Sequence, residues 1–589
     1  MEEAITKAET LGFARFISDE ADAAAEIKKE KPIMVVLGNP PYSVSSANRG
    51  DWIERLIQDY KEGLQEKKTS LDDDYIKFIR FAQWRIDRTG LGVVGIVSNN
   101  SYLRGLTHRR MRESLLTSFD SLYVVNLRGD ARVGDVAPDG SPDENVFDIM
   151  QGVAIAVLVR EEREHEHTGE VVYRDEWGRR QAKYRALVQS HVGTSAFEEL
   201  DPHEPHFFFV PTPRDGLSEY RAGWKLTDVF LTSGNGIKTD RDSFCFDLER
   251  ERLLDRVRRF FRGDYDESFR ERYRLYASSS YDIEGKRDAL PFDAASIQPC
   301  LYRPFDKRWL YYQPGFTSRP AQRVMRHMQH ENLALLGCRQ QARTGFRHVF
   351  CCNGLAECCT VSLKTREITS AFPLYLYVTT DAGDPSLFAR ERTSRDPNLS
   401  GDFIEEVADK LVLDFIPDGK GDLEGTFGPE DVFHYMYAVF HSPTYRERYA
   451  EFLKIDFPRL PLTSDLGLFR ALAEKGGELV ALHLMESSTL DHLITTFPIT
   501  GSNEVEKVRY AEAGRVYINK AQYFEGVEKE VWEFHIGGYQ VLHKWLKDRK
   551  GRTLSYDDVT HYGKIVVALK ETMRLMEEID EIIPSWPID

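Results

Sequence analysis

The feature that most constrains the fold is a short apolar run that two prolines terminate. Residues 33–38 are rich in β-branched side chains and close on a glycine, which predicts a buried parallel strand. Pro40 and Pro41 follow Asn39 directly, and they stop strand pairing and fix a rigid turn that ends at Tyr42. Ligands of open α/β sheets bind at the carboxyl ends of strands, so this turn is the first candidate site.

The groups in this turn suit one kind of chemistry. The Asn39 side-chain oxygen and the Pro40 carbonyl can each accept a hydrogen from one exocyclic amino group, which holds the nitrogen lone pair out of conjugation with its ring. Tyr42 offers a flat apolar face to a planar base. The turn therefore indicates group transfer to an amino or amide nitrogen. The alternative is an ordinary surface turn, because Asn-Pro dipeptides commonly form turns.

Strands and helices alternate beyond the turn. Helical spacing of apolar residues predicts a helix over residues 74–88 that packs on a sheet. Further segments are expected as a polar helix at 1–30, helices at 51–64 and 107–116, and strands at 92–97, 122–127, 152–159 and 207–210. This alternation predicts a doubly wound α/β sheet.

The bulk properties exclude several protein classes. The chain has 589 residues, which suggests about three domains, and its 41% apolar and 29% charged content is that of a globular protein. A net charge of −17 argues against a nonspecific polyanion binder but leaves room for a local basic groove. Seven cysteines, no long apolar run and no signal-peptide pattern predict a cytoplasmic protein without a membrane span.

One region departs from the acidic average. Residues 302–347 hold nine Lys and Arg against two acids, with aromatic residues interleaved. Basic side chains position phosphates and aromatic rings stack on exposed bases, so this composition favours a nucleic-acid groove. The alternative is a salt-bridged surface over an aromatic core. A glycine-rich loop at 233–242 precedes this region and lacks the spacing of a P-loop.

Other segments have plainer interpretations. The pairs Cys351-Cys352 and Cys358-Cys359 lack zinc-site spacing, and the histidines of residues 164–167 are expected in a solvated turn, so no metal is predicted. A charged helix is expected over residues 247–276. Residues 401–490 are expected to be helical, 505–540 to form a β-ribbon, and a helical tail to run to Pro584.

Several motifs together resemble a known family. Gly38-Asn39-Pro40-Pro41-Tyr42-Ser43 resembles motif IV of the γ-type N6-adenine DNA methyltransferases, in the version found in the methyltransferase and specificity half of type ISP restriction–modification enzymes. The resemblance covers essentially the whole chain and includes the stretches 74–80, 98–101, 143–149, 236–242, 302–306, 441–446 and 456–459.

This resemblance implies a fold and a division of the chain. Members of the family are single polypeptides with a nuclease, a helicase, a methyltransferase and a target-recognition domain. The implied fold is a partial Rossmann-like, doubly wound methyltransferase sheet followed by an α+β target-recognition domain and helical segments. The expected boundaries are 1–215 for the catalytic part, 216–400 for target recognition and 401–589 for a C-terminal specificity region.

The resemblance also implies roles for particular residues. Asn39 and Pro40 are expected to hold the N6 amino group of a flipped adenine, with Tyr42 stacked on the base and Pro41 completing the catalytic turn. Phe208 or Phe209 is expected to supply a second stacking ring. The residues expected to contact double-stranded DNA are Lys238, Arg241, Arg303, Arg308, Arg319 and Arg323.

The family's cofactor loop is the main departure. In this family, S-adenosylmethionine is held by a glycine-rich loop and an acidic residue that precede motif IV. The 38 residues before Asn39 contain two glycines, Gly12 and Gly38, and no glycine-rich loop of this kind. We therefore expect a split or truncated chain whose upstream polypeptide carries the nuclease, the helicase and the cofactor loop. Tyr75 and Phe78 are the candidate donor contacts that remain, with Ser98 or Asn99 at the next strand end.

Three functions remain open at this point. The first is a site-specific DNA methyltransferase that transfers a methyl group from S-adenosylmethionine to adenine N6. The second is a non-catalytic DNA-binding specificity subunit of a restriction–modification system. The third is a glutamine-N5 protein methylator, which is disfavoured because it does not need the long aromatic and basic region after the catalytic sheet.

Overall fold

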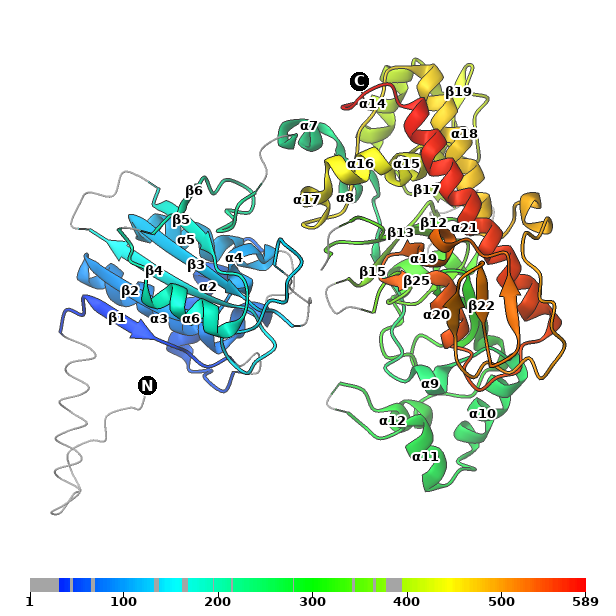
Figure 1. The fold of residues 1–589 in the computed structure, drawn as a ribbon, viewed down its shortest axis with the longest axis horizontal. Coiled ribbons are helices and arrows are strands. Elements are labelled where there is room, and N and C mark those ends of the chain that lie inside the picture. Colours follow the sequence, from blue (N-terminus) through cyan, green and yellow to red (C-terminus); the bar gives the residue numbers. More distant parts are fainter. Residues whose placement is uncertain are drawn as a thin grey trace, which may run out of the picture. The chain divides into compact units, whose positions relative to one another are not determined.

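The chain forms two compact units, Met1–Thr212 (unit 1) and Pro213–Asp589 (unit 2), in the computed structural model shown in Figure 1. The structure describes residues 31–42, 46–64, 69–131, 137–161, 168–193, 195–212, 216–278, 280–341, 345–363, 367–377 and 395–588. The helix expected at 1–30 and the turn expected at 164–167 lie outside these residues. The boundaries expected at 215 and 400 stay predictions.

Unit 1 is built on a six-stranded sheet in the order β1-β2-β4-β3-β5-β6. Its strands are β1 (Val35–Gly38), β2 (Gly92–Asn99), β3 (Ser121–Arg128), β4 (Val153–Arg160), β5 (Glu170–Asp175) and β6 (Glu198–Leu200). β1 pairs parallel with β2, and β3 pairs parallel with β5, while β4 lies antiparallel between β2 and β3. The sheet is therefore mixed, with β1, β2, β3 and β5 running in one direction.

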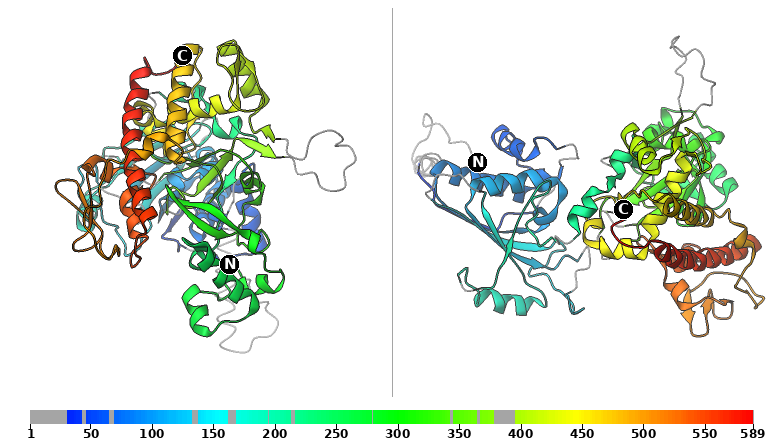
Figure 2. Two further views of the ribbon diagram at one scale, coloured as in Figure 1. Left: turned by 90° about the vertical axis from the view of Figure 1, so that its right-hand side faces the viewer. Right: turned by 90° about the horizontal axis from the view of Figure 1, so that it is seen from above.

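Helices cover both faces of this sheet (Figure 1 and Figure 2). The apolar stripes of α2 (Asp51–Lys61), α3 (Asp74–Thr89) and α5 (Arg109–Ser118) pack with the inward side chains of the central strands in one core. α6 (Arg180–Val188) contributes to a smaller cluster built on the opposite side chains of the same strands. A mixed α/β architecture is confirmed, and the Rossmann-like arrangement stays a prediction.

Two expectations for unit 1 are wrong. The strand at the motif is parallel but not buried: Met34, Val35 and Leu37 are 51%, 59% and 76% exposed, because β1 has β2 as its one neighbour among the described residues. Phe207 and the residues after it do not form a strand. Phe207 has a positive φ of 50°, and its carbonyl accepts a hydrogen bond from the Arg112 side chain instead of a neighbouring strand.

Unit 2 holds two four-stranded sheets, in the orders β14-β10-β11-β9 and β13-β12-β15-β8. The strands are β8 (Gly234–Asn235), β9 (Phe246–Asp247), β10 (Ile297–Arg303), β11 (Asp306–Tyr311), β12 (Ala334–Cys338), β13 (Val349–Cys352), β14 (Leu355–Ala356) and β15 (Thr369–Pro373). β10 and β11 form an antiparallel hairpin that turns at Phe305, which has a φ of 58°.

Long helices pack beside these sheets on one continuous core (Figure 1). They are α14 (Gly401–Leu411), α15 (Pro429–His441), α18 (Leu466–His483) and α21 (Tyr556–Ile582). The β-ribbon expected within 505–540 is present as β21 (Arg509–Ala511), β22 (Arg515–Tyr517) and β23 (Tyr523–Glu525). The helical region and the helical tail are likewise confirmed. Within the residues described, we find no helix long and apolar enough to span a membrane.

The single charged helix expected over residues 247–276 is wrong. The structure has two helices there, α10 (Arg250–Arg262) and α11 (Glu267–Tyr273). Gly263 ends α10 in the left-handed region with a φ of 72°, a conformation that glycine adopts without steric cost. Asp266 then begins α11 by accepting a hydrogen bond from the Phe269 backbone N–H.

Buried neutral histidines make the stability of unit 2 sensitive to acid. His483 is 4% exposed and lies 2.5 Å from the Tyr437 hydroxyl and 3.0 Å from Thr572 Oγ1. Burial, with nearby Arg446, lowers the pKa of His483 to about 3. Below a pH of about 6.5 the unfolded chain binds a proton that the folded chain does not, so stability falls as the pH falls toward 3.

We predict that a His483→Gln variant loses less stability than the wild type between pH 7 and pH 5. The difference should be on the order of 1 kcal/mol, because one histidine no longer takes up a proton on unfolding. Urea denaturation at the two pH values measures it. His492→Gln, at an exposed histidine, is the control and should keep the wild-type pH dependence. Equal pH dependence in both variants would contradict the assignment.

Candidate functional site

The carboxyl ends of four strands meet at one edge of the unit 1 sheet, which we call the carboxyl edge. β1, β2, β3 and β5 run in the same direction, so their last residues lie along this edge. Asn39 follows β1, Asn99 ends β2, Arg128 ends β3 and Asp175 ends β5. The sheet therefore brings the turn that sequence reasoning selected to the edge where α/β proteins bind ligands.

The turn presents its amide to solvent. Asn39 is exposed, and its side chain makes no hydrogen bond with any described residue. Pro40 is buried and Pro41 is exposed. Their two rings restrict the backbone on both sides of the Pro40 carbonyl. Ser43, the last residue of the motif, lies outside the described residues. An exposed amide oxygen beside a rigid carbonyl is the pair of acceptors that an amino group requires.

Tyr42 is anchored by α3. Its half-buried ring meets the Tyr75 ring edge-on, with centroids 6.2 Å apart and an interplanar angle of 82°. Burial, with nearby Asp73, raises the pKa of Tyr42 to about 12, so the phenol is neutral at physiological pH. Tyr75 is 2% exposed and also packs on Tyr102 at 6.5 Å. The Tyr42 ring is thus supported by Tyr75, which itself packs on Tyr102.

The remaining candidates for contact with the methyl donor differ in solvent exposure. Tyr75 is inside the core, whereas Phe78, one turn further along α3, is 46% exposed. Ser98 and Asn99 are buried, and the Asn99 side-chain oxygen accepts a hydrogen bond from the Ser101 backbone N–H at 2.8 Å. Phe78 therefore keeps free surface for a ligand, and Asn99 shapes the turn after β2.

The two candidate stacking rings also differ. Phe209 is 1% exposed and belongs to the core, and its backbone N–H donates to the Leu103 carbonyl. Phe208 is half-buried and stacks on His206 at 5.0 Å with an interplanar angle of 27°. Phe208 is therefore the candidate of the two that has ring surface to offer to a base.

Arg112 is a residue whose position sequence reasoning missed. Its guanidinium is fully buried and donates to the carbonyls of Tyr102 (2.5 Å), Gly105 (2.9 Å), His206 (2.6 Å) and Phe207 (2.9 Å). The guanidinium carbon also lies 5.1 Å from the centre of the Phe208 ring. Burial, with nearby Arg109, lowers the pKa of Arg112 to about 9. Arg112 thus ties the segment after β2 to the segment that carries Phe208.

A second missed feature is a polar network near the ends of β2, β3 and β5. Asn100 donates to Asn126, which in turn donates to the Tyr173 hydroxyl at 2.9 Å. The Tyr173 hydroxyl donates to Asp175, and Arg128 forms a two-pronged ion pair with the same carboxylate at 2.5 and 2.8 Å. Only Asn100 lies in a stretch that carries the family resemblance, and the other residues of the network are far apart in sequence.

The stretch at 143–149 has a structural role. Asp143 and Lys183 form a fully buried ion pair at 2.8 Å, and Asp143 also accepts hydrogen bonds from the backbone N–H groups of Gly129 and Gly178. Lys183 donates further to the Leu127 carbonyl. This pair fixes the long loop after β3 against α6.

In unit 2, two of the expected DNA contacts are inside the fold. Arg303 is 4% exposed and forms an ion pair with buried Glu357 at 2.6 Å. Arg308 pairs with Asp306 at 2.7 Å and with Asp548 at 3.1 Å. The prediction of phosphate contacts for Arg303 and Arg308 is therefore revised, because acids already neutralise both side chains and leave them little free surface.

The aromatic residues of the basic region follow the same pattern. Phe305, Tyr311, Tyr312 and Phe316 are at most 3% exposed and belong to the core, and Tyr302 and Trp309 pack against it. The expected base-stacking role is therefore wrong for the four buried rings. The alternative that sequence reasoning left open, an aromatic core, describes them, because the β10–β11 hairpin turns these rings inward.

The other expected contacts form an exposed basic surface, made of Lys238, Arg319 and Arg323. Lys238 and Arg319 exchange backbone hydrogen bonds at 3.0 and 2.9 Å, so the glycine-rich loop lies directly beside residue 319. Lys238 pairs with Asp240 at 2.8 Å, whereas Arg319 and Arg323 are exposed and form no ion pair with described residues. Arg241 is half-buried and donates to the Tyr276 carbonyl.

The surroundings of Gly236 leave no room for a side chain. A Cβ atom at Gly236 would lie 2.7 Å from the Glu357 backbone, so the loop can approach β14 only with glycine there. Glu357, Cys358 and Cys359 offer ligand atoms within 4.8 Å of one another, and the Glu357 carboxylate is already paired with Arg303. The structure therefore gives this cluster a packing role beneath the loop.

Comparison with known proteins decides the family. Residues 228–578, more than half of the chain, match the family described as the Type ISP C-terminal specificity domain. The chain belongs to the type ISP restriction–modification family. Residues 4–133, which include the Asn39 turn, match the Eco57I restriction-modification methylase family. No curated protein matches the chain at a comparable level of significance.

Solved structures agree with the type ISP fold. The chain is similar to a nuclease-deletion mutant of the Type ISP restriction-modification enzyme LlaGI in complex with a DNA substrate mimic, with 20% identity and a TM-score of 0.71 over 98% of this chain and 54% of that one. It is also similar to the ATP-dependent Type ISP enzyme LlaBIII bound to DNA, with 23% identity and a TM-score of 0.74 over 99% of this chain.

A third structure, of a DrdV–DNA complex, aligns with 21% identity and a TM-score of 0.72 over 96% of this chain. At these identities the likeness shows a shared fold. The type ISP chain spans between 39% and 58% of the length of these three relatives. The family match supports a DNA methyltransferase and specificity portion of a restriction–modification enzyme.

We predict that Arg112→Leu destabilises unit 1 by about 2–4 kcal/mol, because four backbone carbonyls lose a buried donor. Arg112→Lys should restore only part of this loss, since an ammonium cannot reach all four carbonyls. Thermal unfolding measures the change. Arg110→Gln is the matched control, because Arg110 lies on the same helix in an exposed pair with Glu113 and should cost less than about 1 kcal/mol. Equal losses at the two positions would contradict the role of Arg112.

Proposed function

We propose that this chain is the catalytic and target-recognition portion of a site-specific DNA methyltransferase that transfers a methyl group from S-adenosylmethionine to adenine N6. The observation that carries the proposal is the exposed Asn39 amide beside the rigid Pro40 carbonyl, at the carboxyl edge of the sheet. The matched methylase family supports the transfer chemistry in general, and the geometry of the turn supports a planar amine as the acceptor.

The protein's part in the reaction follows from these groups. Asn39 Oδ1 and the Pro40 carbonyl each accept one hydrogen of the amino group, which leaves the nitrogen lone pair free to form the new N–C bond. One amino proton is released as the product forms. The donor supplies an electrophilic methyl group whose bond to sulfur breaks in the same step. Preorganised acceptors of this kind lower the barrier because they do not reorganise during transfer.

The acceptor base must leave the duplex to reach this turn. Tyr42 and Phe208 are the rings proposed to hold it. Both are half-buried, so each has support from the fold and a free surface. Tyr42 is supported by Tyr75, and Phe208 is supported by His206 and Arg112. Rigid rings reduce the ordering that a flipped base would otherwise impose on the protein.

Donor binding is proposed to require a further polypeptide. Val35 and Leu37 expose apolar side chains on an edge strand, a feature that proteins normally cover or pair. We propose that a strand of an upstream polypeptide pairs with β1 and brings the cofactor loop to the carboxyl edge. Phe78 then offers exposed apolar surface to the donor from α3.

The proposed target is double-stranded DNA, held by the exposed basic surface of unit 2. Arg319 and Arg323 form no ion pair with the described residues, so both can neutralise phosphates without breaking one. The structural relatives, which are bound to DNA or to a DNA substrate mimic, support the same partner.

A second candidate is a DNA-binding specificity subunit without catalysis. The match of residues 228–578 to a specificity domain favours it, because recognition then accounts for more than half of the chain. The two proposals differ in one testable property, because only the first predicts methyl transfer that depends on Asn39.

We predict that Asn39→Ala lowers the rate of methyl transfer at least about 100-fold when the chain is assembled with its upstream polypeptide, because a positioned acceptor of the reacting amine is removed. Transfer of labelled methyl groups to an adenine-containing duplex measures the rate. Asn48→Ala, at another exposed asparagine nearby, is the control and should transfer normally. Near-normal transfer by Asn39→Ala would contradict the catalytic assignment.

We also predict that Arg319→Gln combined with Arg323→Gln weakens duplex binding. The salt dependence of binding should fall by about one unit of slope for each phosphate that the variant no longer neutralises. Binding isotherms at several salt concentrations measure both quantities. The control removes the same charge with Arg515→Gln and Arg574→Gln, at exposed arginines that are paired with acids. Unchanged affinity and slope in the first variant would exclude this surface from DNA binding.

A further inference from the structure

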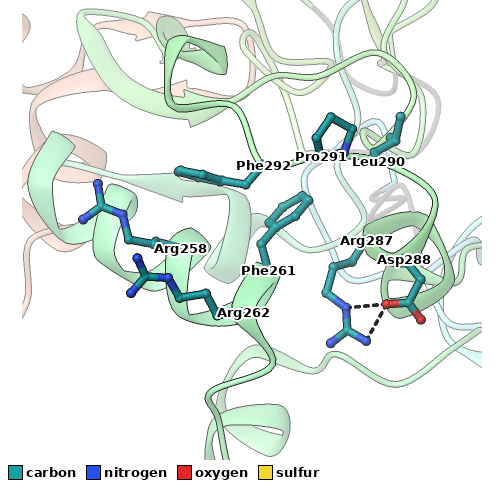
Figure 3. A pocket seen from close by; sticks show the side chains of 8 residues that line it. All are labelled: Arg258, Phe261, Arg262, Arg287, Asp288, Leu290, Pro291 and Phe292. Carbon is teal, nitrogen blue, oxygen red and sulfur yellow. Dashed lines mark hydrogen bonds and ion pairs between the residues drawn. The ribbon is translucent and has the colours of Figure 1, made fainter.

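Unit 2 contains a hollow that the proposed methyl transfer does not use (Figure 3). Its volume is about 510 Å³, within the range of small-ligand sites. Its walls come from α10, from the end of α12 (Ile283–Asp288) and from the segment that follows α12. It shares no residue with the exposed basic surface of Lys238, Arg319 and Arg323.

One wall of the hollow is aromatic and rigid. Phe261 and Phe292 lie 5.7 Å apart between ring centres at an interplanar angle of 55°. Both are supported from the core, because Phe292 lies nearly parallel to Tyr311 at 11° and Phe261 packs on Phe316 at 5.5 Å. Tyr311 and Phe316 are fully buried. The half-buried rings therefore keep their orientation without a ligand.

The other wall carries positive charge. Arg258 and Arg262 lie one helical turn apart on α10, and Figure 3 shows their side chains next to each other. Neither forms an ion pair with a described residue, although other arginines of α10 do: Arg250 pairs with Glu251, and Arg256 with Asp247.

The third arginine of the hollow is already engaged. Arg287 is held by Asp288 at 2.7 Å and by the Tyr265 hydroxyl at 2.6 Å. Because Arg287 and Asp288 neutralise each other, the net positive charge of the hollow comes from Arg258 and Arg262.

We propose that this hollow binds one unpaired nucleotide of a nucleic-acid strand. The phosphate lies between Arg258 and Arg262, since guanidinium groups match phosphate oxygens in geometry and charge. The base lies against Phe261 and Phe292, because every base has a face that stacks on an aromatic ring. Bases within a duplex have both faces covered, so the nucleotide comes from an unpaired segment. The inference deepens the proposed function, since it rests on DNA as the partner.

The test measures binding of a fluorescently labelled, short single-stranded oligodeoxynucleotide to the full chain. We expect Arg258→Gln combined with Arg262→Gln to weaken binding about tenfold or more and to reduce its salt dependence. Phe292→Leu, which keeps the apolar volume but removes the ring face, should weaken binding with its salt dependence unchanged. Thermal unfolding confirms that the variants fold.

A matched control removes the same charge outside the hollow. Arg250→Gln combined with Arg252→Gln changes two arginines of the same helix that are paired with acids, and it should leave oligonucleotide binding unchanged. Equal losses in the control and the hollow variant would overturn the proposal, because the effect is then one of net charge. Wild-type binding that Phe292→Leu does not alter, or that inorganic phosphate displaces as well as a mononucleotide does, would also overturn it.

The duplex-binding variant separates the two hypotheses. Loss of duplex binding in the Arg319 and Arg323 variant, with no effect of the hollow variant on the oligonucleotide, overturns the nucleotide site alone. Failure of wild-type protein to bind either nucleic acid overturns the proposed function and the nucleotide site together.

Discussion

The parallel pairing of β1 with β2 is the constraint on which the candidate site depends. Its register sets Val35 beside Val93 and Gly38 beside Ile96, so the Asn39 turn emerges where β2 approaches its own end. The polar network of Asn100, Asn126 and the β5 residues lies along the same edge because β2, β3 and β5 run parallel. This edge strand also leaves apolar side chains exposed, and that exposure is the observation behind the proposed pairing of β1 with a further strand.

Buried arginines organise both units, and exposed arginines are left for ligands. Arg112 holds two segments of unit 1 through backbone carbonyls, and Arg303 joins β10 to the Glu357 loop through an ion pair. Their charges are satisfied inside the protein. Arg319, Arg323, Arg258 and Arg262 are not satisfied in this way within the described residues, and phosphates are the partners that this chemistry favours. Net charge alone does not reveal this division.

Much of the fold was predictable, since local periodicity marks a strand or a helix wherever one face is buried. The Asn39 turn was found because proline chemistry is local. The exposure of β1 was not predictable, because an apolar run does not say how many neighbours a strand has. The strand expected at Phe207 failed because Arg112, distant in sequence, takes its carbonyl. Arg303 and Arg319 look alike in sequence, and only long-range pairing with Glu357 separates them.

The central proposal is that this chain carries the amine-binding groups of a methyltransferase site and that another polypeptide completes the donor site. The most direct measurement is transfer of label from S-adenosylmethionine to an adenine-containing duplex by the purified chain, with and without an upstream polypeptide that carries the cofactor loop. The account predicts no measurable transfer by the chain alone and transfer to adenine N6 when the polypeptide is added. Robust transfer by the chain alone would contradict it, because the donor site would then be built from residues to which we assign a scaffold role.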